Sequence, residues 1–220
     1  MKKREVVIIG CAGTARNVIE QILDAELNHH AGIHLAGICI DTPDKGTRIV
    51  GVPVIAKTSE IGNIVKETDY SFLFALFKPE KLAERLHLAE SYPVPAGRWT
   101  NFVHPLASIA NSTTLGYGNI ILSNSGLMSD VTLCNFNMIN AGVIIEHETK
   151  IGDGNFLAAG CTIGAEVKMN NANFLGLNSV VREKVNLGNS VYAGMGSLIL
   201  NDFDRALVFG QPARKQKPWS

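Results

Sequence analysis

The chain has 220 residues, and its 20 basic and 20 acidic side chains give a formal net charge of zero. This balance, with no basic run longer than residues 214–217, argues against a nucleic-acid partner or a membrane-surface patch. No stretch approaches the roughly 20 apolar residues that a membrane span requires. The four cysteines show no paired spacing, so we expect reduced thiols in a cytoplasmic protein.

Residues 1–100 alternate strand-like and helix-like segments. The apolar run at 6–9 stops at Gly10, which is typical of a buried parallel strand and not of a signal peptide. Further strands are expected at 33–40 and 71–77, and helices at 15–27, 59–65 and 79–91. This alternation predicts a small, doubly wound, Rossmann-like α/β domain.

Residues 101–220 follow a different period. Every sixth residue from Val103 to Ile199 is apolar, and small, β-branched or asparagine residues mostly follow four positions later. Period six is incompatible with a helical face, and it is the signature of a parallel β-helix in which each flat side takes one hexapeptide. Three sides make a coil of about 18 residues, so residues 18 apart should lie one above the other.

His147 is the candidate proton acceptor in this array. It comes two residues after the inward Ile145, so it should stand at a coil corner and face outward. An imidazole suits the removal of a proton from an attacking amine or hydroxyl. Glu148 is the first candidate to orient it, with Glu146 or a carboxylate of another chain as alternatives, and a plain surface histidine remains the competing interpretation.

Two other kinds of chemistry are disfavoured. Cys161 occupies an inward position four residues after Leu157, so covalent catalysis by a solenoid thiol (Cys161 or Cys134) is not expected. No metal site is expected either, because the array offers one histidine where three are needed, and His104 should form the entry to the solenoid.

The turn between residues 10 and 14 is a candidate phosphate cradle. Gly10, Gly13 and Thr14 lie between a strand and a helix, where backbone amides can face an anion, although the full Gly-rich motif is absent. Asp41, at the end of the second strand, could accept hydrogen bonds from a ribose or base. A tight turn without a ligand and a turn-forming aspartate are the alternatives.

Ala165 is 18 residues beyond His147 and should lie one coil further along. Its backbone N–H could then point at the oxyanion that develops on a thioester carbonyl beside the base.

Several features of the sequence together resemble one family. They are the hexapeptide array, the segment VVIIGCAGTARNVI, the NFVHP junction, the segment VIIEHETKIGDGNFLAAGCTIG and the tail GQPARKQK. The family contains the bacterial sialic acid O-acetyltransferases and the N-acetyltransferases of nucleotide-linked 4-amino sugars of the bacillosamine-pathway type. The resemblance implies a left-handed β-helix, a homotrimer, acetyl-CoA in the groove between neighbouring solenoids and a nucleotide held by the N-terminal domain.

Residue by residue, the resemblance implies that His147 is the general base and Glu148 its paired carboxylate. It places Asn140 near the sugar, Gly10 and Gly13 in the nucleotide-binding turn and Asp41 at the end of the second strand.

The chain departs from the family at Gly13-Thr14-Ala15, where Gly-His or Ser-Gly-His is common, and at Phe156, where a second histidine is common. Gly210, Pro212 and Arg214 are expected over the coenzyme. Arg214 and Lys215 would either meet its phosphates or form a solubilising tail.

The sequence therefore predicts an acetyl-CoA-dependent N-acetyltransferase of a nucleotide-linked amino sugar, such as a 4-amino-4,6-dideoxy hexose, in polysaccharide or glycoprotein biosynthesis. O-acetylation of a sialic-acid-type sugar and a non-catalytic nucleotide-sugar-binding solenoid are the alternatives. An ice-binding solenoid is disfavoured because adjacent threonines occur once, at 113–114.

Overall fold

The N-terminal part of the chain is a five-stranded sheet with helices on both faces. The computed structural model describes residues 3–218. The sheet order is β3-β4-β2-β1-β5, and all neighbours are parallel except β3 and β4. Its elements are β1 (Arg4–Ile9), α1 (Thr14–Leu27), β2 (Ile33–Cys39), β3 (Arg48–Ile49), β4 (Val52–Ala56), α2 (Ile61–Glu67), β5 (Ser71–Phe74) and α3 (Leu82–Ser91), with 3₁₀ turns Thr58–Glu60, Pro79–Lys81 and Ala96–Arg98.

Alternate side chains of β1 divide the core into two layers. Val6 and Ile8 pack with the apolar face of α1, whereas Val7 and Ile9 pack with α2 and α3. This arrangement follows from the two-residue period of a strand that is covered on both faces. The α/β layering is as predicted, and its assignment as a Rossmann-like nucleotide domain stays a prediction.

The observed strands differ from the sequence prediction in two places. The strand expected at 71–77 ends at Phe74, because the chain then leaves the sheet and Phe77 packs on the solenoid instead. Strands β3 and β4 were not predicted, because glycines and prolines punctuate residues 42–53 and β4 contains Pro53, a residue that sequence rules place at sheet edges.

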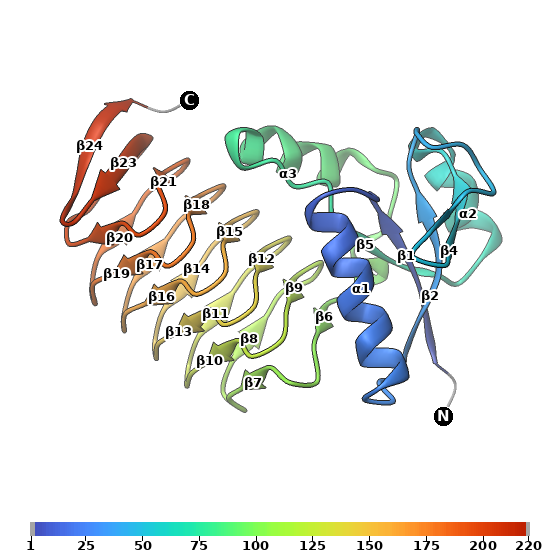
Figure 1. The fold of residues 1–220 in the computed structure, drawn as a ribbon, viewed down its shortest axis with the longest axis horizontal. Helices are drawn as coiled ribbons and strands as arrows, with labels where there is room; N and C mark the ends of the chain where they lie inside the picture. The colour runs from blue at the N-terminus through green and yellow to red at the C-terminus, as the bar shows by residue number, and fades with distance from the viewer. Residues whose placement is uncertain (1–2, 219–220) are drawn as a thin grey trace.

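The rest of the chain is a solenoid of three sheets that run side by side, with parallel strands except in the terminal β23–β24 hairpin (Figure 1). The first, which we call the docking sheet, contains β6 (Phe102–Val103), β9 (Ile120–Ile121), β12 (Met138–Ile139), β15 (Phe156–Leu157), β18 (Phe174–Leu175), β21 (Tyr192–Ala193), β23 (Ala206–Gly210) and β24 (Ala213–Pro218). The six-stranded sheet contains β7 (Ser108–Ile109), β10 (Gly126–Leu127), β13 (Ile144–Ile145), β16 (Thr162–Ile163), β19 (Val180–Val181) and β22 (Leu198–Ile199). The third sheet contains β8 (Thr114–Leu115), β11 (Thr132–Leu133), β14 (Lys150–Ile151), β17 (Lys168–Met169) and β20 (Asn186–Leu187).

The predicted six-residue and 18-residue periods are confirmed. Thr132 pairs with Thr114 on one side and with Lys150 on the other, 18 residues away in each direction. The sixth-residue anchors are buried from Ile121 onward. The first three, Val103, Ile109 and Leu115, are only partly buried, because no coil lies beneath them. This strand pattern fits the left-handed β-helix that the resemblance implies.

A column of asparagines holds one corner of the prism. Asn119, Asn137, Asn155 and Asn173 are fully buried, and each side-chain oxygen accepts the backbone N–H of the residue 18 positions later at 2.7–2.9 Å. Their amide groups also bond to one another along the column. The sequence pattern marked these positions as small or polar without indicating the hydrogen-bonded column.

The N-terminal part packs on the outer face of the docking sheet. The outward-facing Ile120, Met138 and Phe156 are buried, and the Phe77 ring lies 5.8 Å from that of Phe156. Helix α3 crosses the adjoining corner, where Leu86 would lie 3.1 Å from a side chain added at Gly154. The two parts therefore share one apolar interface.

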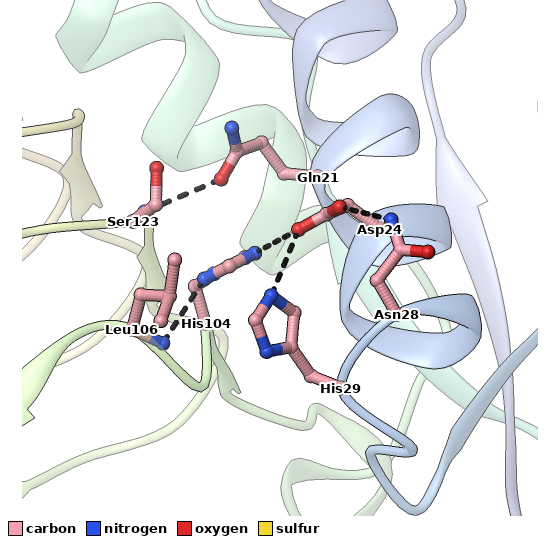
Figure 2. A network of polar contacts seen from close by, with 7 residues as sticks. All are labelled: Gln21, Asp24, Asn28, His29, His104, Leu106 and Ser123. Carbon is pink, nitrogen blue, oxygen red and sulfur yellow. Dashed lines mark hydrogen bonds and ion pairs between the residues drawn. The ribbon is translucent and has the colours of Figure 1, made fainter.

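A polar network ties α1 to the first coil (Figure 2). His104 is 1% exposed, and its Nε2 lies 3.0 Å from Asp24 Oδ2 while its Nδ1 accepts the Leu106 N–H at 3.2 Å. Since Nδ1 accepts, Nε2 carries the proton and donates to Asp24. Hydrogen bonds from Asn28 and from His104 lower the pKa of Asp24.

Within residues 3–218, no helix combines the length and apolar character that would let it cross a bilayer.

Asn137→Ala tests the asparagine column. It removes the acceptor for Asn155 and the donor to Asn119 and to the Gly152 carbonyl, so we expect a loss of about 2–4 kcal/mol of unfolding free energy. Chemical denaturation would measure it, with the exposed Asn111→Ala as the control. Equal stability of the two variants would contradict a structural role for the column.

Asp24→Ala tests the network at the junction. It leaves the buried His104 Nε2–H without an acceptor, so we expect a lower melting temperature than that of wild type at neutral pH. Because the folded-state pKa of Asp24 is lowered, its contribution is present above the unfolded value of about 3.9 and is lost as pH falls through the folded value. The difference in melting temperature between Asp24→Ala and wild type should therefore become smaller below about pH 4. The control Glu20→Ala, on the same helix, should have a melting temperature close to that of wild type at every pH.

Candidate active site

His147 stands where the sequence predicts, at the corner between the six-stranded sheet and the third sheet. Strands β13 and β14 fix the corner on either side, and the buried Thr149 holds it by donating to the Gly164 carbonyl at 2.9 Å. The His147 side chain is 49% exposed and Glu148 is 61% exposed. A rigid frame thus presents the imidazole to solvent.

The structure brings His147 and Glu148 together. Glu148 has a φ of 60°, and its Oε2 lies 3.1 Å from Nδ1 of His147. With Nδ1–H donating to the carboxylate, Nε2 of the neutral ring is left as an acceptor without a partner among the described residues. Within residues 3–218, Glu148 contacts the ring, whereas Glu146 makes no hydrogen bond or ion pair with it. A role of Glu148 in orienting the imidazole stays a prediction.

Ala165 lies one coil beyond His147, as predicted. Glu166 N–H donates to the His147 carbonyl at 2.9 Å, which fixes the stacking of the two corners. Among the described residues the Ala165 N–H has no hydrogen-bond acceptor, so this donor is free to meet a ligand.

A groove adjoins this corner on the third sheet. It has a volume of about 360 Å³ and is lined by Asp130, Glu148, Lys150, Glu166 and Lys168. It is an open surface groove, and it brings both positive and negative side chains beside the imidazole.

The solenoid thiols are poor nucleophiles. Cys161 is buried, and desolvation raises its pKa to about 11. Burial, with a smaller effect of Asp153, also raises the pKa of Cys134. Because the thiolate is the reactive form, neither residue is suited to covalent catalysis.

The turn after β1 has the backbone of an anion cradle. Gly10 has a φ of 124° and Gly13 a φ of 56°, both left-handed values that favour glycine. A side chain at Gly10 would also lie 3.1 Å from Ala15. Thr14 begins α1, whose first turn has no side-chain cap and no acidic residue, so the positive helix end is left uncompensated.

Asp41 is already engaged within the chain. Its carboxylate accepts the backbone N–H of Thr58 at 2.9 Å and the Thr58 hydroxyl at 2.9 and 3.1 Å. The residue is exposed, but these bonds mean that it shapes the loop after β2. A role toward a ribose stays a prediction.

Asn140 does not lie beside His147 within one chain. It follows β12 at the corner between the docking sheet and the six-stranded sheet, one prism corner away. Its side-chain amide donates to the Leu157 carbonyl at 2.8 Å.

The predicted coenzyme residues form the hairpin that ends the docking sheet. Gly210 and Pro212 flank its turn and Arg214 follows in β24, all three exposed. The last coil is three coils beyond that of His147, a rise of about 14 Å. These residues and His147 therefore lie at different corners and heights of one chain.

Asp24, His29 and His104 form the single group of three potential metal ligands among residues 3–218. A metal-bound histidine donates its other ring N–H, but Nδ1 of His104 instead accepts the Leu106 N–H. The group therefore fits a hydrogen-bonded network and not a metal site.

The position of Phe156 gives a reason for one departure from the family pattern. Its ring is 7% exposed and lies between Phe77 and Phe174, at 5.8 and 5.6 Å. It serves the interface between the two parts of the chain, which the spacing of the motif does not indicate.

No protein-family model matches the chain. Uncharacterized protein L142 of Acanthamoeba polyphaga mimivirus is 30% identical over 138 residues, which are 61% of this chain and 24% of that protein. The match thus spans about a quarter of the length of this curated relative.

Several solved structures share the fold across nearly the whole chain. A histidine-to-asparagine mutant of perosamine N-acetyltransferase from Caulobacter crescentus, in complex with CoA and GDP-perosamine, is 24% identical with a TM-score of 0.84, covering 97% of both chains. The acetyltransferase domain of PglB from Neisseria gonorrhoeae, in complex with acetyl coenzyme A, is 19% identical with a TM-score of 0.81, covering 97% and 99%. WeeI from Acinetobacter baumannii is 18% identical with a TM-score of 0.79, covering 97% and 100%.

These likenesses agree with the resemblance seen in the sequence motifs, and the chain has the fold of the hexapeptide-repeat sugar acetyltransferases.

Proposed function

We propose that the chain is an acetyl-CoA-dependent acyltransferase that N-acetylates a nucleotide-linked amino sugar. The observation that carries this proposal is His147, held outward at a solenoid corner with Glu148 on its Nδ1. Support comes from solved structures of the same fold that contain CoA with GDP-perosamine, or acetyl coenzyme A. The sugar class is a 4-amino-4,6-dideoxy hexose.

The proposed reaction is a direct attack on the thioester. Nε2 of His147 takes a proton from the sugar amine as its nitrogen bonds to the acetyl carbonyl carbon, and Glu148 stabilises the resulting imidazolium. The carbonyl oxygen becomes an oxyanion, which the Ala165 N–H stabilises. When the C–S bond breaks, the imidazolium returns the proton to the departing CoA thiolate.

Two features favour an activated amino sugar over a free sugar acceptor. In the Gly10–Thr14 turn, the N–H groups of residues 11–14 have no acceptor among the described residues, and the helix end is uncompensated, which suits a diphosphate. O-acetylation of a free sialic-acid-type sugar would leave this turn without a ligand. The enzyme would act in the cytoplasm, where acetyl-CoA and nucleotide sugars are made.

The geometry of one chain calls for an oligomer, and we propose a homotrimer. The N-terminal part covers the docking sheet, whereas His147 stands at the corner opposite that sheet. A sugar nucleotide held by the N-terminal part of one chain would therefore meet the imidazole of a neighbour. Around the six-stranded sheet, Val180, Leu177 and Met195 are 40, 49 and 76% exposed, and such an apolar surface suits contact with another copy.

The coenzyme would then lie in the cleft between two solenoids. In that position the hairpin residues Gly210, Pro212 and Arg214 of one chain and the corner of another could contact one CoA molecule. Lys215, next to Arg214, adds a second positive charge.

His147→Ala tests the base. We expect kcat for acetyl transfer to fall about 10²–10⁴-fold with little change in oligomeric state, measured as release of free CoA thiol from acetyl-CoA with a panel of nucleotide amino sugars. Glu148→Gln should lower kcat by a smaller factor, on the order of tenfold, because the ring stays in place but its cation is no longer stabilised. Unchanged turnover in His147→Ala would contradict the assignment of His147 as the general base.

Mixed oligomers test whether the site is shared between chains. Thr14→Glu places a negative charge at the helix N-terminus, where it is compatible with the helix but repels a diphosphate. Co-expression of Thr14→Glu and His147→Ala chains should restore roughly a quarter of wild-type activity, because a quarter of the shared sites combine both intact halves. If each chain held a complete site, the mixture would stay inactive.

A further inference from the structure

We propose that Arg85 of α3 pairs with the diphosphate of the nucleotide-linked substrate, opposite the Gly10–Thr14 turn. This inference rests on the proposed function and assigns a residue that neither the motifs nor the family pattern indicated.

Arg85 is the one described residue with a buried side-chain nitrogen or oxygen that has no hydrogen-bond partner. Its Nε atom is the orphaned group. The side chain lies in a narrow crevice between the N-terminal sheet and the solenoid, lined by Phe74, Phe77, Leu82, Leu86, Phe136 and Gly154.

These surroundings leave the positive charge without compensation in the free protein. The crevice is too narrow for a water molecule. Within residues 3–218 no carboxylate lies within ion-pair distance of Arg85, and Glu84, its neighbour on α3, is bonded to Lys81 at 2.8 Å. A guanidinium whose Nε–H is buried among apolar side chains without a partner is unfavourable, and an anion that pairs with its charge offsets this cost. Arg85 is only partly buried as a whole, so an anion can reach it from solvent.

Arg85 lies at the carboxyl edge of the parallel sheet, where ligands of such sheets bind. Phe74, against which it packs, is the last residue of β5, and the neighbouring strand β1 ends one residue before Gly10. A side chain at Gly10 would lie within 3.3 Å of both Ala75 and Leu76, so the turn and Arg85 flank the same loop. The sheet order changes direction between β1 and β5, which is the switch point of an open α/β sheet.

Tyr92 follows α3, the helix that carries Arg85, and leads to the rim that includes Asp41. Tyr92 contacts Thr58, and Thr58 holds the Asp41 carboxylate. The Gly10–Thr14 turn, Asp41 and Arg85 therefore surround one edge of the sheet.

A diphosphate suits this arrangement because it offers oxygens on two sides. The N–H groups of Thr14 and Arg16 in the first turn of α1, which have no acceptor among the described residues, can meet one phosphate. The guanidinium can take the other phosphate through two parallel N–H bonds. The aromatic crevice fixes the stem of Arg85 in advance, so little side-chain freedom is lost on binding.

Arg85→Met tests the assignment, since it keeps the apolar stem and removes the charge. Binding of GDP, UDP and dTDP would be measured by calorimetric titration without acetyl-CoA, with the corresponding nucleosides as references. We expect the dissociation constant of the preferred diphosphate to be at least about tenfold higher for Arg85→Met than for wild type. Binding of the nucleoside should change little, and so should KM for acetyl-CoA. Arg85→Lys should fall between wild type and Arg85→Met. The matched control is Arg205→Met, an exposed arginine on the last coil, which should bind like wild type.

Melting of the free protein separates binding from a structural role. Since the charge is uncompensated, free Arg85→Met should melt at the wild-type temperature or above, but should gain less from added nucleoside diphosphate. A lower melting temperature with unchanged diphosphate affinity would overturn the assignment and leave the proposed function standing. If wild-type protein bound none of the three diphosphates, the nucleotide half of the proposed function would fall, and the role of Arg85 with it.

Discussion

The stacking of 18-residue coils is the constraint on which the rest of the structure depends. Each coil supplies the hydrogen-bond partners of the next, so strands of two residues suffice, and the inward side chains fill a narrow prism. The chain must turn sharply at each corner, and many corner residues other than glycine, among them Glu148 and Glu166, adopt a positive φ. Such a backbone costs on the order of 1 kcal/mol per residue, and the packed stack holds it in place. Glu148 is thereby fixed beside His147 by the fold itself.

The same architecture places the N-terminal part of the chain and His147 on opposite sides of the solenoid. The N-terminal part occupies the outer face of the docking sheet through Phe77, Phe156 and the link between His104 and Asp24. A triangular prism that is covered on one side leaves the opposite corner open, and that corner carries His147. A substrate long enough to include a nucleotide, a diphosphate and a sugar would suit the proposed site, which is divided between neighbouring chains.

Much of this could be predicted from sequence, because the solenoid is governed by a local rule. A strict period of six defines the inward residues, so the outward position of His147 and the stacking of Ala165 above it follow from counting. Contacts between parts of the chain that are distant in sequence obey no such period. Counting could not end β5 at Phe74 or leave the Nε of Arg85 without a partner. Those features depend on how the N-terminal part packs on the solenoid.

Phe156 links that packing to the proposed chemistry. The ring at this position is apolar and packs between Phe77 and Phe174, where the family pattern commonly has a histidine. The oxyanion of the proposed reaction therefore has no imidazole donor from this position, and its stabilisation falls to backbone N–H groups such as that of Ala165. Backbone donors at a stacked corner are held in place before the substrate arrives, so they need no reorganisation as charge develops. The chain can thus combine an apolar interface at Phe156 with acyl transfer that uses a single imidazole.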